Sequence, residues 1–281
     1  MFSPLLYQLS YGTKSTGKYI NFKTILVFFK SFSNFDNYSI NMNLIFDFGN
    51  SFTKYFFVQN NMVVERGSFI SRNFDQNILG INSKGNIDKL IYSSVIDDKG
   101  EKLSDIFKNS KIISLKDENL KLPFSTQYKD ETLGEDRVAL VSAGLNLYPD
   151  KDLLIIDIGT CITYDLVSSN KEYIGGSISP GFNLRYSSLH DYTSNLPKLD
   201  VMPIESIIGE STEEHIHAGV FNGVIGEINY NITRHKNDLP DLETIISGGG
   251  ANFLLNKIKN VIFADQDFLA HGLNHILQIN S

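Results

Sequence analysis

The sequence predicts an α/β protein built from two similar domains. Three observations favour this fold: an apolar strand followed by Asp-x-Gly occurs twice, predicted strands alternate with helices in both halves, and the chain has 281 residues. That length accommodates two cores of ordinary size. The two copies of the motif begin 110 residues apart, a domain-sized repeat that indicates duplication of a whole domain.

The first 41 residues differ from the remainder of the chain. They contain four lysines, one acidic residue and ten Phe or Tyr residues, with no clear helical or strand period. We predict that residues 1–41 are an N-terminal extension outside the native fold and that Met42 is the natural start. A genuine flexible arm is the alternative. The first domain is then expected to cover residues 42–150 and the second to cover residues 151–281.

Each domain is expected to open with a strand, a tight turn and a second strand. Residues 43–58 and 153–167 both follow this pattern. The first strand of each unit is an almost continuous apolar run, which is typical of a strand buried on both faces. These two strands end at Asp47 and Asp157, each followed by one residue and a glycine.

A strand and a helix are expected between the two units, and a strand and a helix after them. Residues 91–95 predict the first strand, and residues 136–146 predict a helix with an apolar face. Residues 173–179 predict a further strand, which Pro180-Gly181 ends. A helix through Leu184 and Leu189 should follow.

The longest predicted helix begins near residue 211. Ser211-Thr-Glu-Glu214 has the spacing of a capping box, and the helix should continue to about His235. Gly219, Gly223 and Gly226 line one face of this helix. Because glycine weakens a helix, this stripe suggests that a neighbour packs very closely against it.

Composition limits the functional classes. Hydrophobic residues at 42% and charged residues at 20% are typical of a soluble globular protein. The net charge of −7 argues against a nucleic-acid partner, and no apolar run approaches the roughly 20 residues that span a bilayer. The single cysteine, Cys161, excludes an internal disulfide framework and favours a cytoplasmic location.

The doubled Asp-x-Gly turn predicts phosphate chemistry. Glycine lets the backbone approach a phosphate, and the amides and hydroxyls that follow can donate to its oxygens. An aspartate at the strand end can hold a metal ion against the same phosphates. For a single copy, an ordinary turn is the simpler explanation. Two copies on matching strands favour a nucleotide phosphate site, and the later Ser247-Gly-Gly-Gly250 loop is consistent with adenine and ribose binding.

Taken in order, these motifs resemble the actin-like superfamily, whose domains are ribonuclease-H-like and enclose a nucleotide cleft. The closer resemblance is to the type III pantothenate kinases, over residues 42–281. It rests on seven loose motifs in the right order: Asp47-Phe-Gly-Asn-Ser-Phe-Thr-Lys54, Gly134-Glu-Asp-Arg137, Asp157-Ile-Gly-Thr-Cys-Ile-Thr-Tyr-Asp165, Gly175-Gly-Ser-Ile-Ser-Pro-Gly181, Thr193-Ser-Asn-Leu-Pro197, Ser211-Thr212 and Asp267-Phe-Leu-Ala-His-Gly-Leu273.

The resemblance implies a reaction and a set of cofactors. ATP with Mg²⁺ would phosphorylate the primary hydroxyl of pantothenate to 4'-phosphopantothenate, the first step towards coenzyme A. A monovalent cation, K⁺ or NH₄⁺, would assist, and the protein would be a cytoplasmic homodimer.

The resemblance also implies roles for residues. Asp136 would be the catalytic base, Asp157 would bind the monovalent cation, and Asp47 would lie near Mg²⁺. ATP would contact Asp47, Phe48, Gly49, Asn50, Ser51, Phe52, Thr53, Lys54 and Thr160. Pantothenate would contact Gly134, Glu135, Asp136, Arg137, Thr193 and Tyr128, with Thr193 reaching across the dimer interface.

Some residues depart from the family pattern. Ser51 replaces a threonine and keeps its hydroxyl, and Cys161 replaces an alanine, which we interpret as packing. The stretch at Tyr128 lacks the proline usual in the family and is one residue short. Arg137 is independently suited to a carboxylate-bearing substrate, because guanidinium pairs well with carboxylates.

Two rival functions stay open from sequence. One is another actin-like small-molecule kinase, and the other is a non-catalytic regulatory or accessory relative of the same fold. The joint presence of Asp47, Asp136 and Asp157 favours an enzyme, because a relative freed from catalysis need not keep all three.

Overall fold

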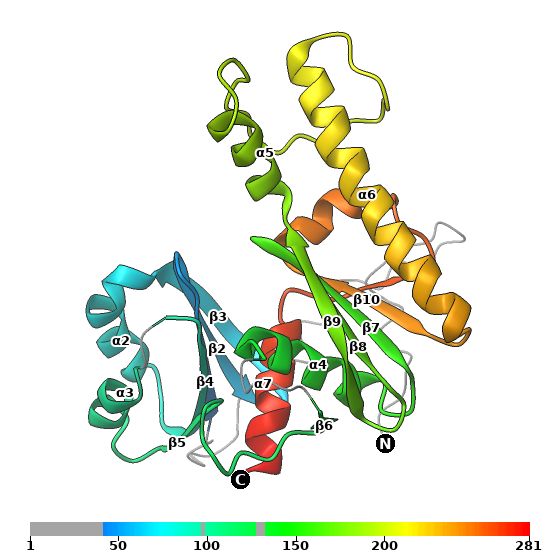
Figure 1. The fold of residues 1–281 in the computed structure, drawn as a ribbon. Helices are drawn as coiled ribbons and strands as arrows, with labels where there is room; N and C mark the ends of the chain where they lie inside the picture. Colours follow the sequence, from blue (N-terminus) through cyan, green and yellow to red (C-terminus); the bar gives the residue numbers. More distant parts are fainter. Residues whose placement is uncertain (1–41, 97–98, 128–132) are drawn as a thin grey trace, which may run out of the picture. The chain divides into compact units, whose positions relative to one another are not determined.

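The computed structural model describes residues 42–96, 99–127 and 133–281. In this part of the chain the first sheet has five strands in the order β3-β2-β1-β4-β5 (Figure 1). β1 lies at the centre, antiparallel to β2 and parallel to β4. The strands are β1 (Met42–Phe48), β2 (Phe52–Gln59), β3 (Met62–Ile70), β4 (Ile87–Ser94) and β5 (Lys111–Ser114).

The second sheet has six strands in the order β11-β10-β7-β8-β9-β6. Its β7 is antiparallel to β8 and parallel to β10. The strands are β6 (Ser125–Thr126), β7 (Leu153–Ile158), β8 (Cys161–Val167), β9 (Glu172–Pro180), β10 (Glu243–Ser247) and β11 (Ile262–Phe263).

The two sheets share one topology. When β6 is left out, β7 to β11 follow the same order and the same parallel and antiparallel pairing as β1 to β5. Each sheet therefore begins with an antiparallel meander and continues through crossovers to parallel strands. This arrangement confirms the predicted α/β class and the repeated fold.

Six α-helices and two short 3₁₀ segments accompany the strands in the described part of the chain. They are η2 (Ser71–Asn73), α2 (Phe74–Asn82), α3 (Gly100–Ile106), α4 (Glu135–Leu147), α5 (Phe182–Asp191), α6 (Thr212–Asp238), η3 (Gly249–Leu254) and α7 (Phe268–Ile279). None of these α-helices is long and apolar enough to cross a membrane.

Helices α4 and α7 lie between the two sheets and join them in a common core (Figure 1). This core includes Ile45 and Ile91 of the first sheet together with Ile155 and Ile245 of the second. Several contacts cross the expected domain boundary near residue 150, among them the packing of α4 on α7. β6 pairs with β9, and α7 packs on β1 and β4.

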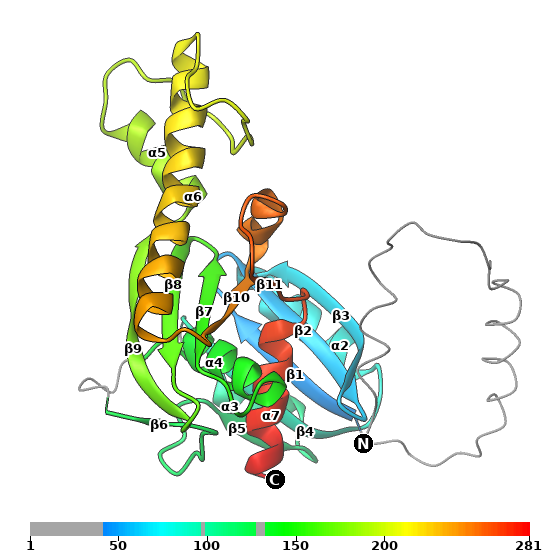
Figure 2. The same cartoon turned by 90° about the vertical axis from the view of Figure 1, so that its right-hand side faces the viewer.

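Helix α6 is longer than the second sheet. Its C-terminal half covers the face of that sheet opposite α4 and α7, and its N-terminal half extends beyond the sheet. Its C-terminal half packs on β7, β8 and β10 through buried residues such as Ile228 and Ile232. Its N-terminal half and α5 project together beyond the sheet, and we call these two segments the arm (Figure 2). The hydroxyl of Ser211 accepts a hydrogen bond from the Glu214 amide (3.2 Å), which confirms the predicted cap.

Candidate functional site

The two Asp-x-Gly turns lie at matching edges of the two sheets. Asp47 is the next-to-last residue of β1, and it faces Lys54 on β2 and Ser93 on β4. Asp157 holds the same place on β7, facing Thr163 on β8 and Ser247 on β10. Side chains at paired positions share one face of a sheet, so each aspartate has a serine on one side.

The two aspartates share an electrostatic environment with Asp136. Burial raises the pKa of Asp47, whereas the Lys54 ammonium, 3.8 Å away, and the Ser93 hydroxyl lower it. Burial also raises the pKa of Asp157 to about 6, and the charge of Asp136 contributes in the same direction. Lys54 and Asp47 influence the pKa of Asp157 as well, so charged groups from both sheets and α4 act on this aspartate.

The first turn exposes its polar residues. Asn50 and Ser51 are exposed between β1 and β2, and the Gly49 amide donates to the Phe52 carbonyl (3.1 Å). A Cβ at Gly49 would crowd that carbonyl, which explains why glycine occupies the position. The side chains of Asn50 and Ser51 are therefore available to a ligand.

Two predicted ATP contacts point their side chains elsewhere. Phe48 is buried and stacks on Phe46 in the core of the first sheet. Thr53 is buried as well, and its hydroxyl lies 3.1 Å from that of Ser71, which donates to the Gly49 carbonyl. Their side chains support the turn, so any contact with ATP would have to come from their backbone.

The second turn is held by the segment that leads into α5. Thr160 is exposed, and its carbonyl accepts from the Gly181 amide (2.9 Å). A Cβ at Gly181 would overlap the carbonyl oxygens of Gly159 and Thr160. Only glycine at position 181 therefore allows this close approach to the turn.

The glycine loop after β10 lies against the end of β7. Gly248 has a φ of 91°, and a Cβ there would overlap the backbone of Ile158. Gly249 has open space around its Cα instead. The loop is therefore next to the turn that follows Asp157, and its role in binding adenine and ribose stays a prediction.

Gly134 and Glu135 set the start of α4. The amide of Ser94, at the end of β4, donates to Glu135 (2.8 Å), and Lys116 pairs with the same carboxylate (3.4 Å). Burial raises the pKa of Glu135 against these partners. Glu135 thus fixes the first turn of α4 to the first sheet, and Asp136 follows it, half-buried.

Arg137 turns into the protein. Its Nε donates to Asp165 of β8 (2.9 Å), and Nη2 donates to the hydroxyl of Tyr173 (2.9 Å). The side chains are only 8% exposed for Arg137 and 0% for Asp165, so this is a buried ion pair. Its predicted contact with a substrate carboxylate stays a prediction. Sequence reasoning gave Asp165 no role, although a charged residue in an otherwise apolar strand was a signal.

Thr193 and Tyr128 complete the predicted substrate contacts. Thr193 lies two residues after α5, exposed, with its hydroxyl donating to the Leu189 carbonyl (2.6 Å). Tyr128 falls outside the described residues. A groove of about 530 Å³ runs between the arm helices, and it is lined by residues that include Arg185, Leu189, His215 and Val220.

Comparison with known proteins gives consistent matches. A family model described as type III pantothenate kinase matches residues 43–234. A type III pantothenate kinase of Christiangramia forsetii is 42% identical over 241 residues, covering 85% of this chain and 99% of the relative. The enzyme of the same name from Flavobacterium psychrophilum is 38% identical over 242 residues, covering 84% and 99%.

A solved structure supports the fold. A Listeria monocytogenes protein proposed to be an N-acetylmannosamine kinase superposes with a TM-score of 0.53 at 11% identity, covering 85% of this chain and 100% of that one. At this identity the likeness concerns the fold alone, and it agrees with the actin-like architecture predicted from sequence.

Proposed function

This chain belongs to the type III pantothenate kinase family, and we propose that it phosphorylates the primary hydroxyl of pantothenate with ATP, the first step of coenzyme A biosynthesis. The observation that carries this proposal is the equivalent placement of two strand-end aspartates: Asp47 lies 3.8 Å from Lys54 on β2, Asp157 has the same position on β7, and the charge of Asp136 acts on both. These carboxylates, from the two duplicated sheets and the start of α4, are the ones that the family resemblance assigns to the metal, the base and the cation.

Asp136 is the proposed base. Phosphoryl transfer depends mainly on alignment and charge stabilisation, and the acceptor hydroxyl loses its proton late in the step. A carboxylate in hydrogen-bond reach of that hydroxyl receives the proton. Asp136 is half-buried at the start of α4, and the Arg137 amide donates to its Oδ1 (2.9 Å), which leaves its other oxygen for the substrate.

The two turns are proposed to hold the ATP phosphates. Asn50, Ser51 and Lys54 would donate from the first turn, and Thr160 would donate from the second. Glycine at positions 49 and 181 allows the close backbone contacts of the two turns. Donors on both sides of the phosphates would stabilise charge that develops during transfer.

The residues near Asp157 fit a bound cation. The charge of Asp136 raises the pKa of both Asp47 and Asp157, and Lys54 is the cation that opposes this effect on both strand-end aspartates. Among the described residues, the buried Oγ1 of Thr163 has no hydrogen-bond partner. We propose that Asp157 and Thr163 would hold K⁺ or NH₄⁺ and that Asp47 would hold Mg²⁺. These ions supply positive charge near the phosphates when bound.

The arm is proposed to form a homodimer interface. Gly219 and Gly226 have no atom within 4 Å of the position that a Cβ would take, and Gly223 meets only Arg185 at 4.0 Å. The close neighbour that the glycine stripe predicts is thus not found in the described part of this chain. A second copy is the proposed neighbour, which would allow Thr193 to contact pantothenate in the partner. We further propose a cytoplasmic location.

A coupled assay of ADP release tests the function. Purified protein receives ATP and Mg²⁺ with pantothenate or with a panel of sugars and polyols, in the presence and absence of K⁺ or NH₄⁺. We expect ADP release with pantothenate and with none of the other acceptors, and we expect the monovalent cation to increase its rate. Turnover of a sugar without pantothenate turnover would support another small-molecule kinase, and no turnover would support a regulatory relative.

A further inference from the structure

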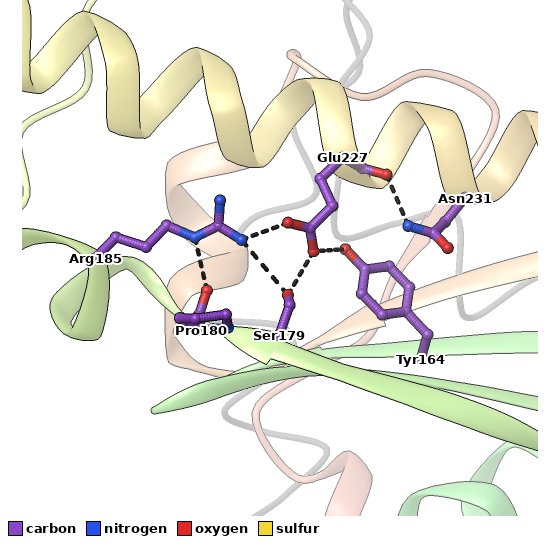
Figure 3. Close-up of polar contacts among 6 residues, drawn as sticks. All are labelled: Tyr164, Ser179, Pro180, Arg185, Glu227 and Asn231. Atoms are coloured by element: carbon purple, nitrogen blue, oxygen red, sulfur yellow. Dashed lines mark hydrogen bonds and ion pairs between the residues drawn. The ribbon is translucent and has the colours of Figure 1, made fainter. Parts of the chain in front are cut away.

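Glu227 of α6 connects the arm to the second sheet (Figure 3). Its Oε1 accepts from the hydroxyl of Tyr164 on β8 (2.8 Å) and from the hydroxyl of Ser179 on β9. Its Oε2 pairs with the guanidinium of Arg185 on α5. One carboxylate of α6 therefore ties together two strands and a second helix.

Arg185 makes a second contact in a different direction. Its Nε donates to the carbonyl oxygen of Pro180, the last residue of β9 (2.7 Å), while Nη2 pairs with Glu227 (Figure 3). The planar guanidinium fixes the angle between these two donors. Arg185 thus holds the end of β9 at a set position relative to α6.

Pro180 is followed by Gly181, which contacts the turn that carries Thr160. The next amide, that of Gly181, donates to the Thr160 carbonyl (2.9 Å), and the missing Gly181 side chain lets the two segments touch. A continuous series of contacts therefore runs from Glu227 through Arg185 and Pro180-Gly181 to Thr160.

The Arg185–Glu227 pair is partly shielded from water. The side chains are 22% and 26% exposed, so their attraction is less screened than that of an ordinary surface pair. Although burial opposes ionisation, the hydrogen bonds from Ser179, Arg185 and Tyr164 hold the pKa of Glu227 below its usual value. Glu227 is consequently ionised near neutral pH.

We propose that Arg185 and Glu227 are positioning residues for ATP. By fixing the end of β9 to α6, they hold the Gly159-Thr160 turn where it meets the phosphates. This inference rests on the proposed assignment of Thr160 to the ATP site. It requires the affinity for ATP, rather than that for pantothenate, to depend on the pair.

The decisive variant is Arg185→Lys. Lysine keeps the positive charge opposite Glu227 but lacks the second, rigidly held donor for Pro180. Because a hydrogen bond from a charged group is involved, we expect KM for ATP to rise about tenfold, with KM for pantothenate within about twofold of wild type. A fluorescent ATP analogue, titrated without pantothenate, should lose affinity by a similar factor.

Three variants complete the experiment. Arg234→Lys makes the same change on α6 in an exposed pair with Asp238 and should leave both KM values unaltered. Tyr164→Phe removes one donor to Glu227 without touching the Arg185–Pro180 contact, so its effect on ATP should be smaller than that of Arg185→Lys. Glu227→Gln, which loses the ion pair, should shift KM for ATP in the same direction as Arg185→Lys.

Two results would overturn the inference. One is an Arg185→Lys protein that binds the ATP analogue as wild type does, and the other is an equal rise in both KM values. Thermal melting shows whether each variant is folded. If Arg185→Lys is unfolded, the KM values of Glu227→Gln decide whether the pair positions ATP. Failure of the proposed function gives a different result: the wild-type protein would not phosphorylate pantothenate. If it still bound the ATP analogue, the affinities of wild type and Arg185→Lys for the analogue could still be compared.

Discussion

Thr163 occupies on β8 the position that Lys54 occupies on β2. Lys54 faces Asp47 across the first hairpin, and Thr163 faces Asp157 across the second. Asp47 thus has the ammonium group of a lysine beside it, whereas Asp157 has the hydroxyl of a threonine. That hydroxyl is buried and has no hydrogen-bond partner among the described residues. Comparison of the two repeats therefore shows that position 163 of the second sheet lacks the positive charge that Lys54 provides in the first.

Replacing Thr163 with lysine should reduce the dependence on a monovalent cation. The new ammonium would lie opposite Asp157 and supply the charge that K⁺ or NH₄⁺ is proposed to supply. We expect the ratio of rates in KCl and in tetramethylammonium chloride, at equal ionic strength, to approach one. KCl should raise the melting temperature of the wild type, because a bound cation stabilises the folded state, and should not raise that of this variant.

Two further variants at position 163 control for the change in size. Thr163→Ser keeps the hydroxyl and should keep the cation dependence. Thr163→Val keeps the shape but removes the hydroxyl, so half-maximal activation should need more K⁺. If a folded Thr163→Lys protein requires K⁺ as wild type does, Thr163 is not next to the cation.

Asp136→Asn should reduce turnover strongly. Asparagine has nearly the same shape but cannot accept the hydroxyl proton, and general-base catalysis typically contributes about 10²- to 10⁴-fold. Steady-state kinetics should show the loss in kcat, while thermal melting shows an intact fold. Removal of a negative charge near Asp157 should at the same time lower the pKa of that aspartate. Near-normal kcat would show that another group receives the proton.

The strand-end aspartates were predictable because hairpin strands place them by a local rule. A buried apolar run followed by Asp-x-Gly fixes both the strand and its turn, and duplication makes the pattern specific. The partner of Arg137 was not predictable in this way. Asp165 lies 28 residues later in the chain, and strand patterns do not show which side chain of a neighbouring helix will meet a buried carboxylate.

The glycines of the predicted turns and loops make close contacts with backbone, whereas the glycines predicted to admit a close helix neighbour do not in the described part of the chain. Gly49, Gly181 and Gly248 all contact backbone so closely that a side chain would not fit. The stripe on α6 meets no such neighbour in the described residues, whereas Gly272 of α7 touches α4. Sequence periodicity gives the face on which a glycine lies, but the neighbour depends on tertiary packing.

His271 should make the stability of the protein depend on pH. The carboxylate of Asp265, 3.7 Å from the His271 imidazole, raises the pKa of His271, with the charge of Asp267 adding to the effect and burial opposing it. The imidazolium form therefore stabilises the fold fully below the unfolded pKa of about 6.5, and this contribution is lost as pH rises through the folded pKa.

Urea unfolding of wild type and His271→Gln at pH 5.5, 7 and 8.5 tests this prediction. The stability difference should favour wild type at pH 5.5 and shrink towards pH 8.5. It should not exceed about 1 kcal/mol, because Asp265 is more than half exposed. High salt should reduce it further. Parallel pH profiles for the two proteins would show that the pair contributes nothing.

Gly272→Ala and Gly219→Ala should change stability in opposite directions. A Cβ at Gly272 would overlap the Ala139 carbonyl oxygen of α4, so α4 and α7 would have to separate within the core that joins the two sheets. Overpacking of this kind costs about 1 to 3 kcal/mol. A Cβ at Gly219 meets no atom within 4 Å, and alanine favours a helix over glycine by up to about 1 kcal/mol.

Unfolding at low protein concentration should therefore show a loss for Gly272→Ala and a gain for Gly219→Ala. The second variant also tests the arm as an interface. If a partner packs on the glycine stripe, the added methyl group weakens association, and sedimentation should show more monomer even though the monomer is more stable. A Gly219→Ala protein that associates as wild type does would place the interface elsewhere, because a close helix contact has no room for the methyl group.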